Sequence, residues 1–217
     1  MSALERGIRN VAVFLDRDGV LIEDTRIYNA YLTQPDQVRL LPGAAEAVRK
    51  LNQAGLLVVV VTNQAAIARG IITEDELYSI HTRMSELLQH QAAARLDKIY
   101  ICPYHPDGVV ARYARPSDCR KPEPGMLLQA AQELNLHLPR CFLVGDQQSD
   151  MLAARKVRCK AIAVATEPFG AKWRSWTEGI PDFVAADLPD AVAWILDSLA
   201  HEDPKEALSY SSELVDP

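Results

Sequence analysis

Near-continuous apolar runs recur along the chain and alternate with segments of helical periodicity. Runs in which neighbouring positions are all apolar are typical of strands covered on both faces, as in a parallel sheet. We therefore predict five strands, at residues 11–15, 56–61, 99–102, 141–144 and 161–165.

Between these runs, apolar residues return every three or four positions, the spacing that places them on one face of a helix. The clearest case follows Thr73 and Glu76, which have the spacing of a capping box, and continues through Leu77, Ile80 and Met84. Strands that alternate with helices predict an α/β fold, doubly wound and Rossmann-like, with helices on both faces of a parallel sheet. Ligands of such folds bind at the carboxyl ends of the strands. Further helices are predicted at residues 44–54, 124–135, 149–157 and 190–199.

The length of 217 residues and the hydrophobic share of 48% suit one well-buried domain, which we place at residues 1–200. The polar remainder, residues 201–217, is predicted to be a flexible tail. With 23 basic and 29 acidic residues, the formal charge is -6. No global positive field is present, so we do not expect a nucleic-acid partner.

The chain carries no predicted membrane segment. Its longest strictly apolar run, residues 56–61, is far shorter than a bilayer span, and Glu5, Arg6 and Arg9 stand where a signal peptide would be apolar. We expect a cytoplasmic protein. A chain of this size does not need disulfides, and its dispersed cysteines agree with a reducing compartment. They are Cys102, Cys119, Cys141 and Cys159.

Two carboxylates, Asp16 and Asp18, follow the first predicted strand, and Gly19 comes next. Separated by one residue, these carboxylates would repel each other unless a positive group lay between them. A divalent cation would supply that charge, and oxygen ligands favour Mg²⁺ over zinc. The alternative is a pair of aspartates that only stabilise a turn.

Polar residues also follow the second strand, as Thr62, Asn63 and Gln64. A hydroxyl and exposed backbone N–H groups at a strand end can hold a phosphate. The same residues are common in ordinary turns, so this signal is weak by itself.

A third strand end carries Asp146, with Asp150 four residues later. Asp146 can complete a magnesium site with Asp16. Asp150 is expected to order a bound water or to cap the following helix, and Ser149 could also cap it.

Arg120 and Lys121 lie in a loop just before a predicted helix. A lysine here can offset charge on a phosphoryl group during its transfer. The alternative is a solvated lysine, which is the usual state of this residue.

Taken in order, the strings FLDRDGV, VVVVTNQ, CRKPEPGM and LVGDQQSD resemble the four motifs of the haloacid dehalogenase (HAD) superfamily of aspartate-nucleophile phosphatases. The resemblance implies a phosphatase in which Asp16 attacks phosphorus. It also implies that Asp18 protonates the leaving alcohol and later takes a proton from the attacking water. A dehalogenase does not need that second aspartate, because its leaving group is not an alkoxide.

The same resemblance assigns the phosphoryl oxygens to Thr62 and the Asn63 amide, and the balance of charge to Lys121. The segments where a cap domain could be inserted, residues 20–42 and 95–120, are too short for one, so no large cap is expected. The resemblance further implies a Mg²⁺ site made of the side chains of Asp16 and Asp146 and the backbone carbonyl of Asp18.

The longer strings TNQAAIARG, ICPYHPDG and CRKPEPGMLLQAA resemble the heptose bisphosphate phosphatases of nucleotide-heptose synthesis for bacterial surface glycans such as lipopolysaccharide. They are more distantly similar to histidinol-phosphate phosphatases. This resemblance implies a small sugar bisphosphate as substrate, with a second phosphate gripped by the Arg120 guanidinium. The implied substrate-binding residues are Asp24, Thr25, Asn63, Gln64, Arg120 and Lys121.

One part of that resemblance fails. Relatives of this type hold a structural zinc with Cys-x-His and Cys-x-Cys pairs, but Tyr104 and Ser117 stand where two of those ligands should be. A site would have to use Cys102, Cys119 and His105. Two thiolates do not make a closed tetrahedral site, and a histidine in a polar loop is usually a surface residue, so zinc is not expected.

Three other readings remain at this point. The enzyme could be a histidinol-phosphate phosphatase, or, from a different class of function, a non-catalytic protein that binds a sugar phosphate. A phosphatase of DNA ends is disfavoured by the acidic balance. We expect a monomer or a weak homo-oligomer.

Overall fold

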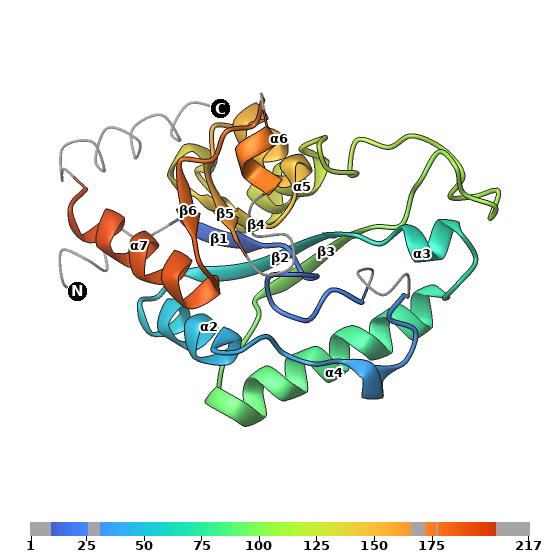
Figure 1. Cartoon of the computed structure of the whole chain (residues 1–217), viewed down its shortest axis with the longest axis horizontal. Helices are drawn as coiled ribbons and strands as arrows, with labels where there is room; N and C mark the ends of the chain where they lie inside the picture. Colours follow the sequence, from blue (N-terminus) through green and yellow to red (C-terminus); the bar gives the residue numbers. More distant parts are fainter. Residues whose placement is uncertain (1–9, 26–30, 166–171, 177, 203–217) are drawn as a thin grey trace.

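The structure is a computed structural model and describes residues 10–25, 31–165, 172–176 and 178–202 (Figure 1). Within these residues, six parallel strands form one sheet in the order β3-β2-β1-β4-β5-β6. Their bounds are β1 (Ala12–Leu15), β2 (Leu57–Asn63), β3 (Lys98–Cys102), β4 (Phe142–Gly145), β5 (Lys160–Val164) and β6 (Phe183–Ala185).

Helices cover both faces of this sheet. Figure 1 shows α2, α4 and α7 on one face and α5 and α6 on the other. The α-helices are α2 (Ala44–Gln53), α3 (Ala65–Ala68), α4 (Glu74–Ala92), α5 (Gly125–Leu134), α6 (Gln148–Lys156) and α7 (Leu188–Ala200). Short 3-10 helices are η2 (Pro35–Gln37), η3 (Leu138–Arg140) and η4 (Lys172–Ser175). The predicted α/β fold, doubly wound around a parallel sheet, is confirmed.

The apolar runs are explained by the two hydrophobic cores of the molecule. Successive side chains of a strand point to opposite faces of the sheet. Val13 and Leu15 of β1 therefore lie in the core beneath α2, α4 and α7, while Ala12 and Phe14 lie in the core beneath α5 and α6. All four side chains are fully buried.

The predicted strands and α-helices agree with the observed ones apart from their ends and two short additions, and the three 3-10 helices were not predicted. Strand β6 and helix α3 were not predicted, because segments of three and four residues are too short to show a period. The capping box is present, since the Thr73 Oγ1 accepts from the Glu76 N–H at 3.2 Å and the Thr73 N–H donates to the Glu76 carboxylate at 2.7 Å.

Strand register brings three loops to one edge of the sheet. Leu15, the last residue of β1, is paired with Val60 of β2 on one side and with Val144 of β4 on the other. The residues that follow these strands therefore emerge side by side. Because β2 and β4 flank β1 and lead to opposite halves of the sheet, this edge is the switch point where such folds bind ligands.

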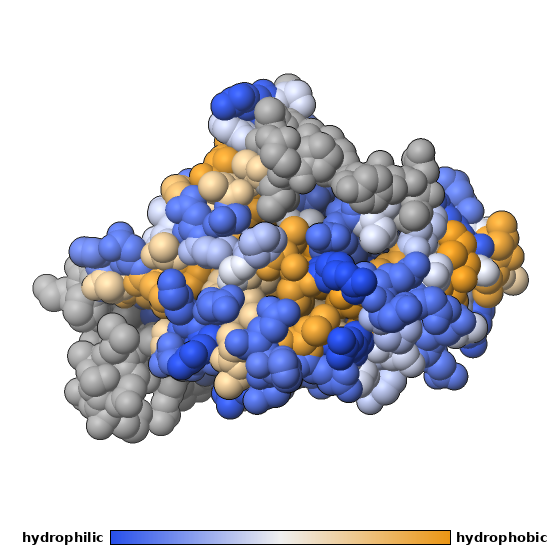
Figure 2. Space-filling model, turned by 60° about the horizontal axis from the view of Figure 1, so that its bottom comes forward, coloured by the Kyte–Doolittle hydropathy of each residue, from blue (hydrophilic) through white to orange (hydrophobic). Residues whose placement is uncertain are grey.

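The described segments that join β1 to α2 and β3 to α5 contain loops and short turns rather than a folded cap. On the face that carries α4, Figure 2 shows apolar surface between hydrophilic side chains. A cavity of about 850 Å³ opens between α4 and β3. Among the described residues, no helix has the length and apolar character needed to cross a membrane. Most of the predicted tail, residues 203–217, lies outside the described residues.

Candidate active site

Asp16 occupies the centre of the site because β1 ends directly before it. Its N–H donates to the Val144 carbonyl of β4 at 2.9 Å, which continues the sheet by one residue. The side chain is almost fully buried. Its Oδ1 accepts from the Arg17 N–H at 2.7 Å and lies 3.0 Å from the Lys121 Nζ. The predicted nucleophile is thus held by one backbone donor and one cation.

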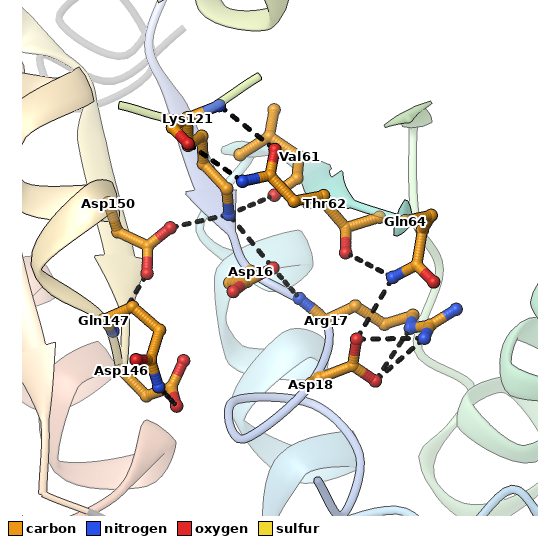
Figure 3. A network of polar contacts seen from close by, with 11 residues as sticks. Asp16, Arg17, Asp18, Val61, Thr62, Gln64, Lys121, Asp146, Gln147 and Asp150 are labelled. Atoms are coloured by element: carbon orange, nitrogen blue, oxygen red, sulfur yellow. Dashed lines mark hydrogen bonds and ion pairs between the residues drawn. The ribbon is translucent and has the colours of Figure 1, made fainter. Parts of the chain in front are cut away.

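The Lys121 ammonium has an acceptor for each of its three donors. Its Nζ lies 3.0 Å from Asp16, 2.6 Å from Asp150 and 2.8 Å from the carbonyl of Val61 (Figure 3). The Lys121 side chain is 2% exposed, so the solvated lysine considered from the sequence is wrong.

Asn63 fixes the backbone that carries this lysine. Its amide Nδ2 donates to the Lys121 carbonyl at 3.0 Å, and its Oδ1 accepts from the Lys121 N–H at 3.0 Å. This reciprocal pair joins the end of β2 to a loop 58 positions further along the chain. The Asn63 side chain therefore positions the Lys121 backbone, a role that the sequence around Asn63 did not indicate.

Asp146 and Asp150 complete a cluster of carboxylates with Asp16. One oxygen from each lies within 4.8 Å of the others, and all three residues are buried. Asp150 also accepts from the Gln147 N–H at 3.0 Å, so it caps α6 as expected. Sequence reasoning left Asp150 outside the cation site, because capping alone explained a carboxylate at that position.

Gly19 allows the loop after β1 to approach this cluster. Its φ of +82° lies in the left-handed region, and a Cβ at this position would lie 2.8 Å from the Asp146 Oδ2. A larger residue would have to displace Asp146 from the carboxylate cluster.

Asp18, the second predicted catalytic aspartate, is held by two side chains. The Arg17 guanidinium donates to Oδ1 from Nε at 3.1 Å, and its Nη2 lies 2.9 Å from both Oδ1 and Oδ2. Gln64 donates from Nε2 to the Asp18 Oδ2 at 3.1 Å and to the Thr62 Oγ1 at 2.8 Å (Figure 3). Thr62 and Gln64 are buried.

The site has more buried negative charge than its lysine can offset. The pKa of Asp16 is raised to about 6, because burial and the carboxylates of Asp150 and Asp18 raise it by more than Lys121 lowers it. Three neighbouring carboxylates supply only oxygen ligands, which suit a hard divalent cation such as Mg²⁺. The donor set therefore agrees with the predicted cation.

A cavity of about 450 Å³ opens above these residues. It is lined by every residue predicted to bind substrate, which are Asp24, Thr25, Asn63, Gln64, Arg120 and Lys121. Tyr31 and Arg69 also line it, and the Arg69 guanidinium donates to the Tyr31 hydroxyl. These two residues were missed. Arg69 could have been found within the string TNQAAIARG, whereas Tyr31 had no such signal.

The cysteines near this cavity differ from expectation. Cys102 at the end of β3 and Cys119 are joined in a disulfide, which was not predicted, because a chain of this size does not need one. The Nδ1 of His105 accepts from the Asp107 N–H at 3.1 Å. Cys141 and Cys159 are free and buried. The absence of zinc stays a prediction.

Comparison with known proteins places this fold and site in context. Residues 118–191 match the family described as HAD-hydrolase-like. The D-glycero-D-manno-heptose-1,7-bisphosphate 7-phosphatase of Thermosynechococcus vestitus is 41% identical over 195 residues, which cover 87% of this chain and 97% of that protein. The D-glycero-beta-D-manno-heptose-1,7-bisphosphate 7-phosphatase of Yersinia pestis is 38% identical, over 83% of this chain and 94% of that protein.

A solved structure agrees with the sequence relatives. The crystal structure of D,D-heptose 1,7-bisphosphate phosphatase from B. bronchiseptica, complexed with magnesium and phosphate, has a TM-score of 0.75 and 33% identity to this chain. The match covers 87% of this chain and 99% of that one. Fold and site thus define a HAD-type phosphatase, an enzyme that hydrolyses phosphate monoesters. Within this class, the chain belongs to the family of D-glycero-D-manno-heptose-1,7-bisphosphate 7-phosphatases.

Proposed function

We propose that this protein removes the 7-phosphate of D-glycero-D-manno-heptose 1,7-bisphosphate in a Mg²⁺-dependent reaction, as a step of nucleotide-heptose synthesis. The observation that carries the proposal is the arrangement around Asp16, which has Lys121 at 3.0 Å on one carboxylate oxygen and two further carboxylates close by. The names of the curated relatives supply the substrate.

In the first step, a carboxylate oxygen of Asp16 attacks phosphorus while the bond from phosphorus to the sugar oxygen breaks. Asp18 gives its proton to that oxygen, so the sugar leaves as a neutral alcohol and Asp16 carries the phosphoryl group. The Thr62 hydroxyl and the Asn63 N–H hold the phosphoryl oxygens, while the Lys121 ammonium balances their charge. These donors face a group whose charge is redistributed during transfer, which is where fixed donors lower the barrier.

In the second step, water attacks the phosphorus of the aspartyl-phosphate and gives one proton to Asp18. The bond between phosphorus and the Asp16 oxygen breaks, inorganic phosphate leaves, and Asp16 is again a carboxylate. Asp18 ends the cycle protonated, ready to act again as an acid.

The cation would be held by Asp16, Asp146 and the backbone carbonyl of Asp18, with Asp150 beside them. When bound, Mg²⁺ would offset the repulsion between a carboxylate nucleophile and an anionic phosphate. The raised pKa of Asp16, to about 6, supports this, because burial and the neighbouring carboxylates leave its ionised form short of positive charge.

The cavity supports a bisphosphate substrate. Arg120 and Arg69 both line it, so two guanidinium groups are available for a second phosphate. Phosphorylated sugars do not cross an apolar bilayer unaided, and on this ground we propose that the enzyme works in the cytoplasm, although the Cys102–Cys119 disulfide does not add support for a reducing compartment. We also propose that the enzyme is a monomer or a weak homo-oligomer.

The test is release of inorganic phosphate from heptose bisphosphate, histidinol phosphate and fructose bisphosphate, with Mg²⁺ and with EDTA. We expect heptose bisphosphate to have the highest kcat/KM by at least about tenfold, and EDTA to stop turnover. A preference for histidinol phosphate would make the proposed substrate wrong.

The covalent step is tested with Asp16→Asn, which should abolish turnover while the circular dichroism spectrum stays unchanged. Asp197→Asn is the matched control, because its side chain is 73% exposed on α7. Appreciable activity of Asp16→Asn would refute the aspartyl-phosphate.

A further inference from the structure

Arg17 stands between the two predicted catalytic aspartates and has no role in the reaction proposed above. Its side chain is 4% exposed, although a guanidinium is usually solvated. Nε and Nη2 of Arg17 both donate to the Asp18 carboxylate, with distances of 2.9–3.1 Å. Hydrogen bonds from two nitrogens of one planar guanidinium fix both the position and the plane of the carboxylate.

The third nitrogen of this guanidinium, Nη1, contacts a residue of helix α4. The His81 Nε2 lies 3.2 Å from the Arg17 Nη1, and the two residues are 64 positions apart in the chain. A guanidinium can only donate, so the imidazole Nε2 is the acceptor and the ring proton is on Nδ1. Burial, with the charge of Arg17, lowers the pKa of His81 to about 3, so the ring stays neutral at physiological pH.

His81 itself has a rigid support. It is 8% exposed and lies on α4, a helix of 19 residues with a capping box at its start. Leu77, Ile80 and Met84 of the same helix are buried in the core against the sheet. The position of the imidazole is thus set by packing that does not involve the carboxylate cluster.

We propose that His81 is a positioning residue that acts through Arg17 to hold Asp18 in place for proton transfer. The proposal rests on the proposed function, in which Asp18 gives a proton to the leaving sugar oxygen and regains one from water. Without His81, the buried Nη1 of Arg17 loses this acceptor, and the guanidinium would turn to satisfy the donor elsewhere. The hydrogen bond from the Gln64 Nε2 to the Asp18 Oδ2 would not replace the two-nitrogen contact that Arg17 makes.

This role predicts an effect that depends on the leaving group. An alkoxide leaving group needs the proton of Asp18, whereas 2,4-dinitrophenolate is stable without one. The value of kcat/KM reports the steps up to the first irreversible one, here formation of the aspartyl-phosphate, so it isolates proton donation from the later hydrolysis.

The experiment compares kcat/KM of His81→Leu on a sugar phosphate and on 2,4-dinitrophenyl phosphate. We expect at least a tenfold loss on the sugar phosphate and less than a twofold loss on the aryl phosphate. His81→Gln should recover the sugar-phosphate activity to within about threefold, because its Oε1 can accept from Arg17. Met84→Leu is the matched control, a buried residue of α4 that should leave the ratio of the two activities unchanged.

Equal losses on the two substrates would show that His81 serves only the fold, and no loss on either would show that Asp18 does not depend on it. Both outcomes overturn the proposal while the phosphatase assignment stands. A wild-type enzyme that cleaves neither substrate would instead refute the proposed function, and this inference with it.

Discussion

The Nζ of Lys121 lies 2.6 Å from the Oδ1 of Asp150, and both side chains are almost completely removed from solvent. Burial lowers the pKa of Lys121, but the carboxylates of Asp150 and Asp16 outweigh it, so the pKa is raised. This lysine is therefore a permanent cation in the centre of the site. Two of its three partners are buried carboxylates, Asp16 and Asp150, and the third is the carbonyl of Val61.

Loss of this cation should be costly for stability as well as for activity. We expect Lys121→Met to lower the free energy of unfolding by about 3–5 kcal/mol, because two buried carboxylates lose their partner. Adding Asp150→Asn should recover part of that loss, since one of the stranded charges is removed. Urea unfolding in EDTA of both single variants and the double variant measures the coupling. Additive effects of the two substitutions would contradict a direct interaction.

Asp16 should make the metal-free protein less stable as the pH rises. Its pKa is raised from 3.8 to about 6, chiefly by burial, so the folded state binds this proton more tightly than the unfolded chain does. As the pH rises from about 4 to about 6, the free energy of unfolding therefore falls by roughly 3 kcal/mol, since each pKa unit corresponds to about 1.4 kcal/mol.

Asp16→Asn removes this titration. In EDTA, the variant should be more stable than wild type at pH 7.5, and the difference should shrink toward pH 4, where wild-type Asp16 is protonated. Thermal unfolding at both pH values checks the sign. Added Mg²⁺ should stabilise the wild type and have less effect on the variant. A difference that grows toward pH 4 would contradict the raised pKa.

Asn63 should affect turnover through the backbone of Lys121. Asn63→Ala removes two hydrogen bonds to that backbone, so we expect a loss of about 1–3 kcal/mol in stability and at least about tenfold in kcat. The matched control is Asn52→Ala. Asn52 makes the same reciprocal pair with the Arg95 backbone, at 3.1 and 2.9 Å, away from the predicted catalytic carboxylates. It should lose stability but not activity, and equal kcat losses would make the proposed role wrong.

The Cys102–Cys119 disulfide closes a segment of 17 positions that includes the loop before Arg120. Alkylation of denatured, unreduced protein should label two cysteines, Cys141 and Cys159, and reduction should expose all four. Reduction should lower Tm by about 6–12 °C, since closing such a loop contributes about 3 kcal/mol. Metal analysis should find no stoichiometric zinc. Four labelled cysteines without reductant, or one zinc per chain, would contradict these expectations.

Local pattern was sufficient for much of this fold. The apolar runs identified five of the six strands within the described residues, because a strand covered on both faces must be apolar at consecutive positions. Order along the chain also placed Asp16, Thr62 and Asp146 at strand ends. The carboxyl ends of parallel strands lie at a common edge of the sheet, so order along the chain predicts that these residues meet.

What the sequence by itself determined was therefore the class of fold, the family and the residues at the strand tips. The tertiary structure alone decided that Lys121 pairs with Asp150, that Asn63 holds the Lys121 backbone and that His81 supports Arg17. The physical reason is that hydrophobic periodicity shows only which face of a strand or helix is buried. Contacts between elements far apart in the chain depend instead on how the helices and loops pack on the sheet, and this packing leaves no period in the sequence.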